Sequence, residues 1–130
     1  MLENILFWLY LLNFVFLMMH ETDAAYWKEW KFFGKLGASL SDKAGLTVFV
    51  LARLPICIPL LYGLVNLERR SGLIISLILS GFLIIHFVLH MLLIKKGHKE
   101  FTWPISYFVQ AGMLLLSLVQ LPITIYILSQ

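Results

Sequence analysis

Three histidines and two carboxylates are the residues of this sequence best suited to chemistry. His20, Glu21 and Asp23 follow a long apolar run, and His86 and His90 lie near the end of another. Side chains four residues apart share one face of an α-helix, so both imidazoles of the later pair can bind a single ion. With the earlier histidine and aspartate they form a nitrogen and oxygen ligand set that suits zinc or iron. We therefore predict a divalent metal ion, zinc or iron, with His20, Asp23, His86 and His90 as ligands.

Other uses of the same histidines stay open at the level of sequence. A haem between His20 and either His86 or His90 would make the chain an electron-transfer protein. A polar cluster with a structural or proton-handling role would also account for ionisable side chains in apolar segments.

Any catalysis at this site would need an acid or base and a group that stabilises an anion. We expect Glu21 as the general base, with Arg53 or Tyr107 stabilising the anion. The sequence contains no glycine-rich phosphate loop, no G-x-S-x-G motif and no C-x-x-C pair. A hydrolase triad is therefore not supported.

The elements that must hold these residues are membrane-spanning helices. Hydrophobic residues make up 61% of the 130 and charged residues only 13%, a balance that excludes an ordinary soluble domain. Four apolar segments reach the roughly 20 residues that a helix needs to cross a bilayer, and they are too long for the strands of a membrane barrel. We predict an all-α, polytopic bundle of four transmembrane helices in a single domain, with spans at about 4–20, 44–67, 73–94 and 104–128.

The antiparallel course of these spans brings the chemically useful residues to one depth. His20 ends the first span, and His86 and His90 lie late in the third. Arg53 and Tyr107 lie early in the second and fourth. Because successive spans run in opposite directions, all five residues are expected in the same half of the bundle.

Arg53 is the charge that lies deepest within an apolar segment. Pro55 and Pro59 follow it and remove two amide donors, which predicts a kinked second helix. An arginine in a membrane is less costly when a carboxylate pairs with it. We expect an ion pair with Asp23 or Glu21 in preference to a bound anionic headgroup or substrate.

The distribution of lysine and arginine predicts the orientation. The first and third loops contain seven lysines, whereas the second has two arginines and the termini have neither. The first and third loops are therefore expected in the cytoplasm and both termini outside, in a cell inner membrane. The net charge of +3 suits anionic lipid, so we expect membrane lipids and no nucleic acid as partners. The first segment lacks a basic start and a cleavage site, which favours a retained helix.

Two further patterns concern packing. Aromatic and basic residues are interleaved after the first span, which predicts a short amphipathic interfacial helix over about residues 21–35. Gly72, Ser76 and Ser80 recur every four residues, which predicts a seam for close helix packing and a possible homo-oligomer.

The segment "HETDAAYWKEW" after a first membrane helix, with "HFVLH" on the third, resembles a group of small uncharacterised bacterial four-helix membrane proteins that share a domain of unknown function. It is also similar to HXXEE-type membrane proteins, although their paired glutamates are absent here. The resemblance implies the fold and a site of histidines and acids, but no activity. Membrane metal hydrolases of the ceramidase-like superfamily are similar in the site alone, and they suggest a lipid-like substrate. A non-enzymatic membrane helper or transporter subunit is the remaining alternative.

Overall fold

The computed structural model describes residues 1–32 and 34–130, and it confirms an all-α fold with four spans. Each span is long and apolar enough to cross a membrane. The second is built from two consecutive helices, and no strand occurs in the described part of the chain. The spans comprise α1 (Leu2–Tyr26), α3 (Asp42–Leu51) with α4 (Leu54–Val65), α5 (Arg70–Lys95) and α6 (Pro104–Leu128).

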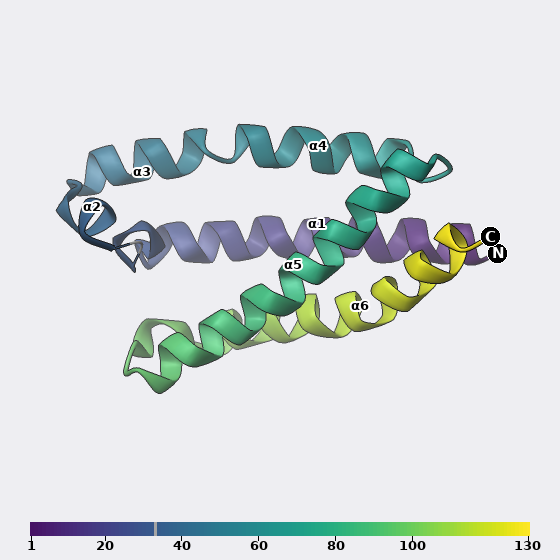
Figure 1. The fold of residues 1–130 in the computed structure, drawn as a ribbon. Coiled ribbons are helices and arrows are strands. Elements are labelled where there is room, and N and C mark those ends of the chain that lie inside the picture. Colours follow the sequence, from purple (N-terminus) through teal and green to yellow (C-terminus); the bar gives the residue numbers. More distant parts are fainter. Residues whose placement is uncertain (33) are drawn as a thin grey trace.

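The spans run alternately up and down, so the two termini lie at the same end of the bundle (Figure 1). The opposite end carries the short elements η1 (Glu29–Phe32), α2 (Gly34–Ser39) and η2 (Lys99–Thr102). Helix α6 packs against both α1 and α5, while α4 packs mainly against α5. Residues late in α1 and α5 therefore lie at the same end as residues early in α6.

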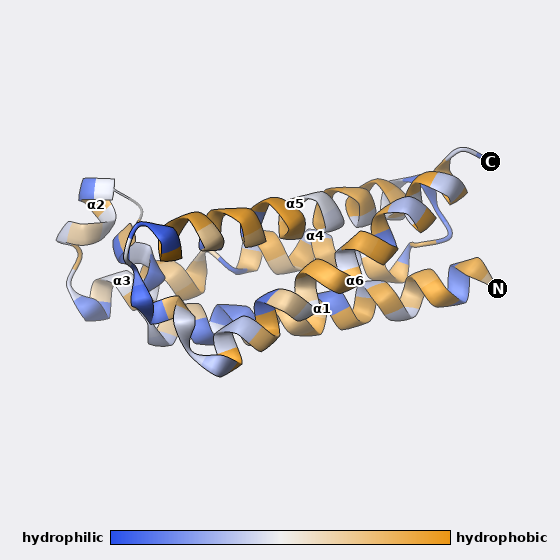
Figure 2. Ribbon diagram, turned by 90° about the horizontal axis from the view of Figure 1, so that it is seen from below, coloured by the Kyte–Doolittle hydropathy of each residue, from blue (hydrophilic) through white to orange (hydrophobic). Residues whose placement is uncertain are grey.

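An apolar core holds the helices together, and the outer surface is apolar as well. Leu17, Leu79, Leu83 and Met113 are all buried in one cluster at the centre of the bundle. Hydrophobic residues also cover the length of the spans, whereas the hydrophilic ones gather largely at the end that carries α2 and α3 (Figure 2). An apolar exterior is what a bilayer requires of the helices that contact it.

A network of neutral polar side chains links α1, α5 and α6 within the bundle. The Asn13 amide donates to Gln120 Oε1 at 2.6 Å, and the Gln120 amide donates to Ser76 Oγ at 2.9 Å. Ser76 Oγ also hydrogen-bonds Thr124 Oγ1 at 2.9 Å. All four side chains are fully buried. Such bonds between membrane helices are worth about 0.6 kcal/mol each on average.

The seam of small residues on α5 is used within the chain. Gly72, Ser76 and Ser80 are buried, and Ser80 Oγ donates to the Ser76 carbonyl at 2.8 Å. A Cβ atom at Gly72 would collide with the backbone carbonyl of Asn66, so only glycine allows this approach of the chain. The homo-oligomer predicted through this seam stays a prediction.

The second span is interrupted where the sequence predicts a kink. Helix α3 ends at Leu51, and α4 begins at Leu54 after a turn through Ala52 and Arg53. Pro55 stands in the first turn of α4, where its missing amide is tolerated. The interruption places Arg53 between two helices.

The segment after α1 differs from the single interfacial helix predicted over about 21–35. Helix α1 continues to Tyr26, and the chain then turns at Lys28, which has a φ of 55°. The turn leads into η1, and α2 begins after it at Gly34, while Phe33 lies outside the described residues. A positive φ cannot be part of a right-handed helix, so the chain changes direction here.

Trp30 anchors η1 to the second span. Its side chain is buried, and its ring centroid lies 5.6 Å from that of Phe49 on α3. Gly45 makes room for the indole, because a Cβ at that position would overlap it. This packing holds the neighbouring Glu29 against the bundle.

Candidate metal centre

Three histidine side chains meet at the end of the bundle opposite the termini. His20 projects from α1, and His86 and His90 project from successive turns of α5. The Nε2 atoms of His20 and His86 are 2.7 Å apart, and those of His86 and His90 are 3.0 Å apart. His20 and His90 are each only 1% exposed. The structure thus brings together three of the four predicted metal ligands.

Glu29 of η1 is the carboxylate that joins them. Its Oε2 lies 3.6 Å from His20 Nε2, and its Oε1 lies 3.5 Å from His90 Nε2. One donor atom from each of the four side chains lies within 4.8 Å of every other. The glutamate is 6% exposed, so its charge is largely withdrawn from solvent.

The sequence reasoning missed Glu29 for a geometric reason. Nine residues separate it from His20, which in a continuous α-helix is about two and a half turns and would place it on the opposite face. The turn at Lys28 changes the direction of the chain and brings Glu29 to the same side as His20. Lys28 is not a glycine, so no residue type in this stretch marks the left-handed conformation.

The spacing of the donors fits a small divalent ion. Zinc–nitrogen bonds of about 2.0–2.1 Å in a tetrahedron put neighbouring donors about 3.3 Å apart. The histidine nitrogens, at 2.7 and 3.0 Å, are slightly closer than this, and the carboxylate oxygens, at 3.5 and 3.6 Å, are slightly farther. The four donors lie within 4.8 Å of one another, so binding an ion requires the more distant pairs to move together. Nitrogen and carboxylate donors together form a ligand set that could hold a metal ion.

A buried side-chain amide lies next to His90 and bears on its ability to bind a metal ion. Gln110 Nε2 on α6 lies 3.1 Å from His90 Nδ1, and both residues are buried. Gln110 Oε1 has no hydrogen-bond partner in the described chain. Rotation of the amide by 180° would bring Oε1 to Nδ1, where it would accept the Nδ1 proton and leave the Nε2 lone pair free for a metal. Gln110 is therefore placed to set the tautomer of His90.

Glu29 supplies negative charge to the cluster. Burial by itself would raise the pKa of its carboxyl group, but a hydrogen bond from His90 and the nearby charges of protonated His20, His90 and His86 outweigh burial and lower it. The carboxylate form is therefore favoured. It offsets the charge of a cation more effectively than a neutral donor would.

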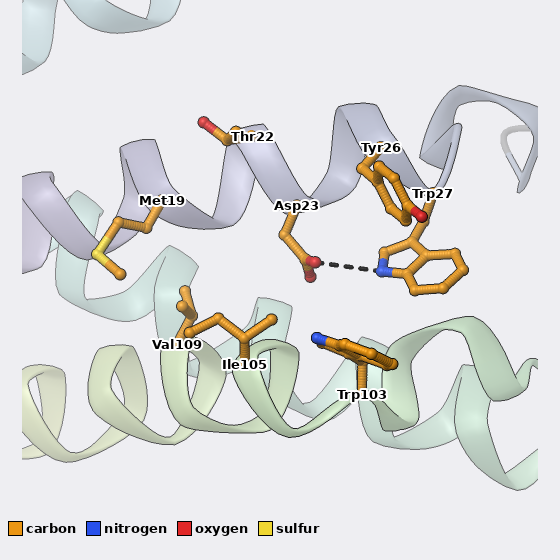
Figure 3. Close-up of a pocket in the computed structure, with 8 residues that line it drawn as sticks. All are labelled: Met19, Thr22, Asp23, Tyr26, Trp27, Trp103, Ile105 and Val109. Atoms are coloured by element: carbon orange, nitrogen blue, oxygen red, sulfur yellow. Dashed lines mark hydrogen bonds between the residues drawn. The ribbon is translucent and has the colours of Figure 1, made fainter.

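Asp23, predicted as the fourth ligand, lies outside this group. Its Oδ1 accepts a hydrogen bond from Trp27 Nε1 at 3.1 Å, and its side chain points toward Ile105 and Trp103 (Figure 3). Three residues of helix turn the side chain about 60° away from His20 around α1. On that side of α1, the Asp23 side chain faces α6.

The residues predicted for catalysis are not among the four donors. Glu21 forms an ion pair with Arg53, as the sequence predicts, and the Arg53 guanidinium lies 3.8 Å from the Phe49 ring centroid. Tyr107 is 41% exposed on α6. Both charges of the ion pair are thus engaged with each other, and the tyrosine faces outward.

Comparison with known proteins assigns the chain to a family. Residues 6–127 match a family of unknown function, DUF6713. The chain belongs to this family. No curated protein and no solved structure matches it.

The matched region of this DUF6713 member contains all four donors of the cluster. It begins within α1 and ends within α6, so it takes in the whole bundle. The unknown function of the family agrees with the resemblance of the sequence to proteins with a domain of unknown function. Membership of this family therefore assigns no activity to the chain.

A cavity of about 260 Å³ opens onto the cluster between η1 and α5. Glu29, His86 and His90 form its polar wall. Apolar side chains form most of the remainder, and Lys96 lies at the end of α5. The complete lining comprises Glu29, Phe32, His86, Leu89, His90, Leu92, Leu93 and Lys96. A molecule with an apolar portion can reach the donors by this route.

Proposed function

We propose that this chain is an integral-membrane metalloprotein in which His20, Glu29, His86 and His90 bind one divalent ion, zinc or iron. The observation that carries the proposal is the convergence of their four donor atoms within 4.8 Å of one another. These donors come from two long helices and a turn that are distant in sequence. Buried imidazoles and a buried carboxylate that face one another are stabilised by a shared cation.

The same geometry favours a metal ion over haem. A porphyrin ring must pass between two axial ligands that hold its iron from opposite faces. The Nε2 atoms of the three histidines lie 2.7 and 3.0 Å apart in succession, which leaves no slot for a ring. A single ion requires no such slot.

We extend the proposal to a metal-dependent membrane enzyme that acts on a lipid-like substrate. The cavity that opens onto Glu29, His86 and His90 supports this extension, because most of its other lining residues are apolar. A zinc or iron ion that accepts a further ligand beyond these four side chains would polarise a carbonyl or phosphoryl oxygen and activate water. Glu21, the base predicted from the sequence, is paired with Arg53, and Glu29 is a proposed ligand, so neither carboxylate is assigned as the base.

The positions of Lys96 and the loop lysines bear on which side of the membrane the metal centre faces. Lys96 lines the cavity just past the end of α5, where it can contact an anionic headgroup. The lysine-rich first and third loops lie at the same end of the bundle as the cluster. We therefore propose that the metal centre faces the cytoplasmic side of an inner membrane.

Elemental analysis of the detergent-purified protein tests the metal site. The wild type should carry about one zinc or iron per chain. The double variant His86→Ala/His90→Ala should carry almost none, because it retains only two of the four ligands. Circular dichroism must show that the double variant keeps its helices.

His98→Ala is the matched control. His98 lies 3.9 Å from Glu100 and outside the cluster, and it is the fourth histidine of the chain. This variant should retain the metal of the wild type. Near-zero metal in the wild type, or equal metal in the wild type and the double variant, would overturn the proposal.

A further inference from the structure

A second and larger cavity lies between α1 and α6. Its volume is about 520 Å³, and it is mainly apolar. Three aromatic residues surround one end, and a single carboxylate, that of Asp23, lies between the two helices (Figure 3). The lining comprises Met19, Thr22, Asp23, Tyr26, Trp27, Trp103, Ile105 and Val109. None of these residues is a donor of the metal cluster.

The carboxylate of Asp23 is only half satisfied. Its Oδ1 accepts the Trp27 indole proton, whereas its Oδ2 is buried and has no hydrogen-bond partner in residues 1–32 and 34–130. No ion pair within those residues reaches it. Lys28, close by in sequence, pairs instead with Asp42. A buried carboxylate oxygen without a partner is costly, and a cation in the cavity would remove that cost.

The aromatic residues are suited to the same cation. Tyr26 and Trp27 pack edge to face, with ring centroids 4.8 Å apart. Trp103 approaches from the start of α6 on the other side of the cavity (Figure 3). Indole and phenol faces attract ammonium groups, most strongly when these are quaternary.

The cavity also has the length of part of an acyl chain. Met19 and Trp27 are eight residues apart on α1, or about 12 Å along the helix axis. The aromatic end lies where α1 ends and α6 begins, at the depth expected of headgroups. Met19 and Val109 lie toward the interior of the bilayer, where a hydrocarbon chain would pack.

We propose that this cavity binds one lipid with an ammonium headgroup. The ammonium group contacts Asp23 Oδ2 and the faces of Trp27 and Trp103, and one acyl chain extends along Met19 toward Val109. The site is separate from the metal centre, and its occupancy does not depend on bound metal.

Native mass spectrometry of the full chain tests this proposal. The protein is released from micelles that contain equimolar phosphatidylcholine and phosphatidylglycerol with identical acyl chains, and the ratio of the two bound lipids is measured. Asp23→Asn removes the charge but keeps an oxygen that can accept the Trp27 proton. We expect it to lower the bound choline-to-glycerol ratio about tenfold relative to the wild type.

Two further variants make the result specific. Glu3→Gln removes an exposed carboxylate near the opposite end of α1 and should leave the ratio unchanged. Trp103→Leu removes one aromatic face and should lower the ratio, which provides an independent test if Asp23→Asn does not fold. Circular dichroism of both cavity variants must show the helix content of the wild type.

An unchanged ratio in folded Asp23→Asn would overturn the assignment. An equal fall in Glu3→Gln would also overturn it, because the effect would then report net charge alone. Loss of the choline preference with the helices retained would support the lipid site whatever the outcome of the metal experiment.

Discussion

Glu29→Gln should weaken metal binding about a hundredfold. The substitution keeps the shape of the side chain and one oxygen donor, but it removes the negative charge. At an effective dielectric constant of about 20, a unit charge about 4 Å from a divalent ion contributes about 8 kcal/mol before solvation is considered. Solvation and the remaining amide oxygen reduce the net loss to about 3 kcal/mol, which corresponds to roughly two orders of magnitude in affinity.

The burial of Glu29 explains why solvation does not cancel the electrostatic attraction between its carboxylate and the ion. The side chain is 6% exposed, so folding has already removed most of its water. The pKa of its carboxyl group is lowered despite that burial, so the folded chain holds the charged form. Metal binding therefore does not have to supply the whole cost of desolvating the carboxylate.

Competition for zinc between the protein and a chromophoric chelator measures the effect. Asp23→Asn is the matched control, since it makes the same chemical change one turn after His20 on α1, and it should alter the affinity less than about threefold. The opposite pattern would refute the assignment of Glu29: zinc affinity lowered in Asp23→Asn and unchanged in Glu29→Gln. It would support the ligand set predicted from the sequence.

Three other perturbations probe the surroundings of the site. Gln110→Leu removes the side-chain amide that lies beside His90 Nδ1 and should lower zinc affinity about 10- to 100-fold; an unchanged affinity would mean that the amide does not orient the imidazole. Gly45→Ala displaces the Trp30 indole and should cost about 1–3 kcal/mol of stability together with a several-fold loss of zinc affinity. Wild-type zinc affinity in this variant would mean that the packing of Trp30 does not affect metal binding. Removal of metal by a chelator should lower the free energy of unfolding by about 2.7 kcal/mol if zinc was present at 100 times its dissociation constant. The double histidine variant should show no such loss in thermal unfolding, and an equal loss in both proteins would indicate an effect of the chelator itself.

Much of the fold could be predicted because the bilayer imposes it. Apolar segments of about 20 residues in this chain can span only as helices. The pairing of Glu21 with Arg53 was predictable for a similar reason, since an arginine at that depth needs a carboxylate. The spacing of His86 and His90 also predicts a shared target, because a helix of known pitch fixes their relative directions.

The choice of carboxylate was not predictable from spacing. Asp23 lies within about 60° of His20 around α1, but which neighbouring helix occupies that side depends on the packing of the whole bundle. Glu29 reaches the cluster because Lys28 adopts a φ of 55° and Trp30 packs on α3. The conformation of Lys28 and the packing of Trp30 both depend on tertiary contacts, and neither can be detected from hydrophobic periodicity.

The distribution of polar groups along the bundle bears on which function the site serves. The metal cluster and the neutral network around Gln120 are separated along α1, α5 and α6 by the buried apolar side chains of Leu17, Leu83 and Met113. A route for protons or ions across the membrane would need polar groups or water through this layer. The cluster instead opens sideways, through the cavity that includes Leu89 and Lys96. This arrangement favours chemistry on a molecule that enters from the membrane over transport through the bundle.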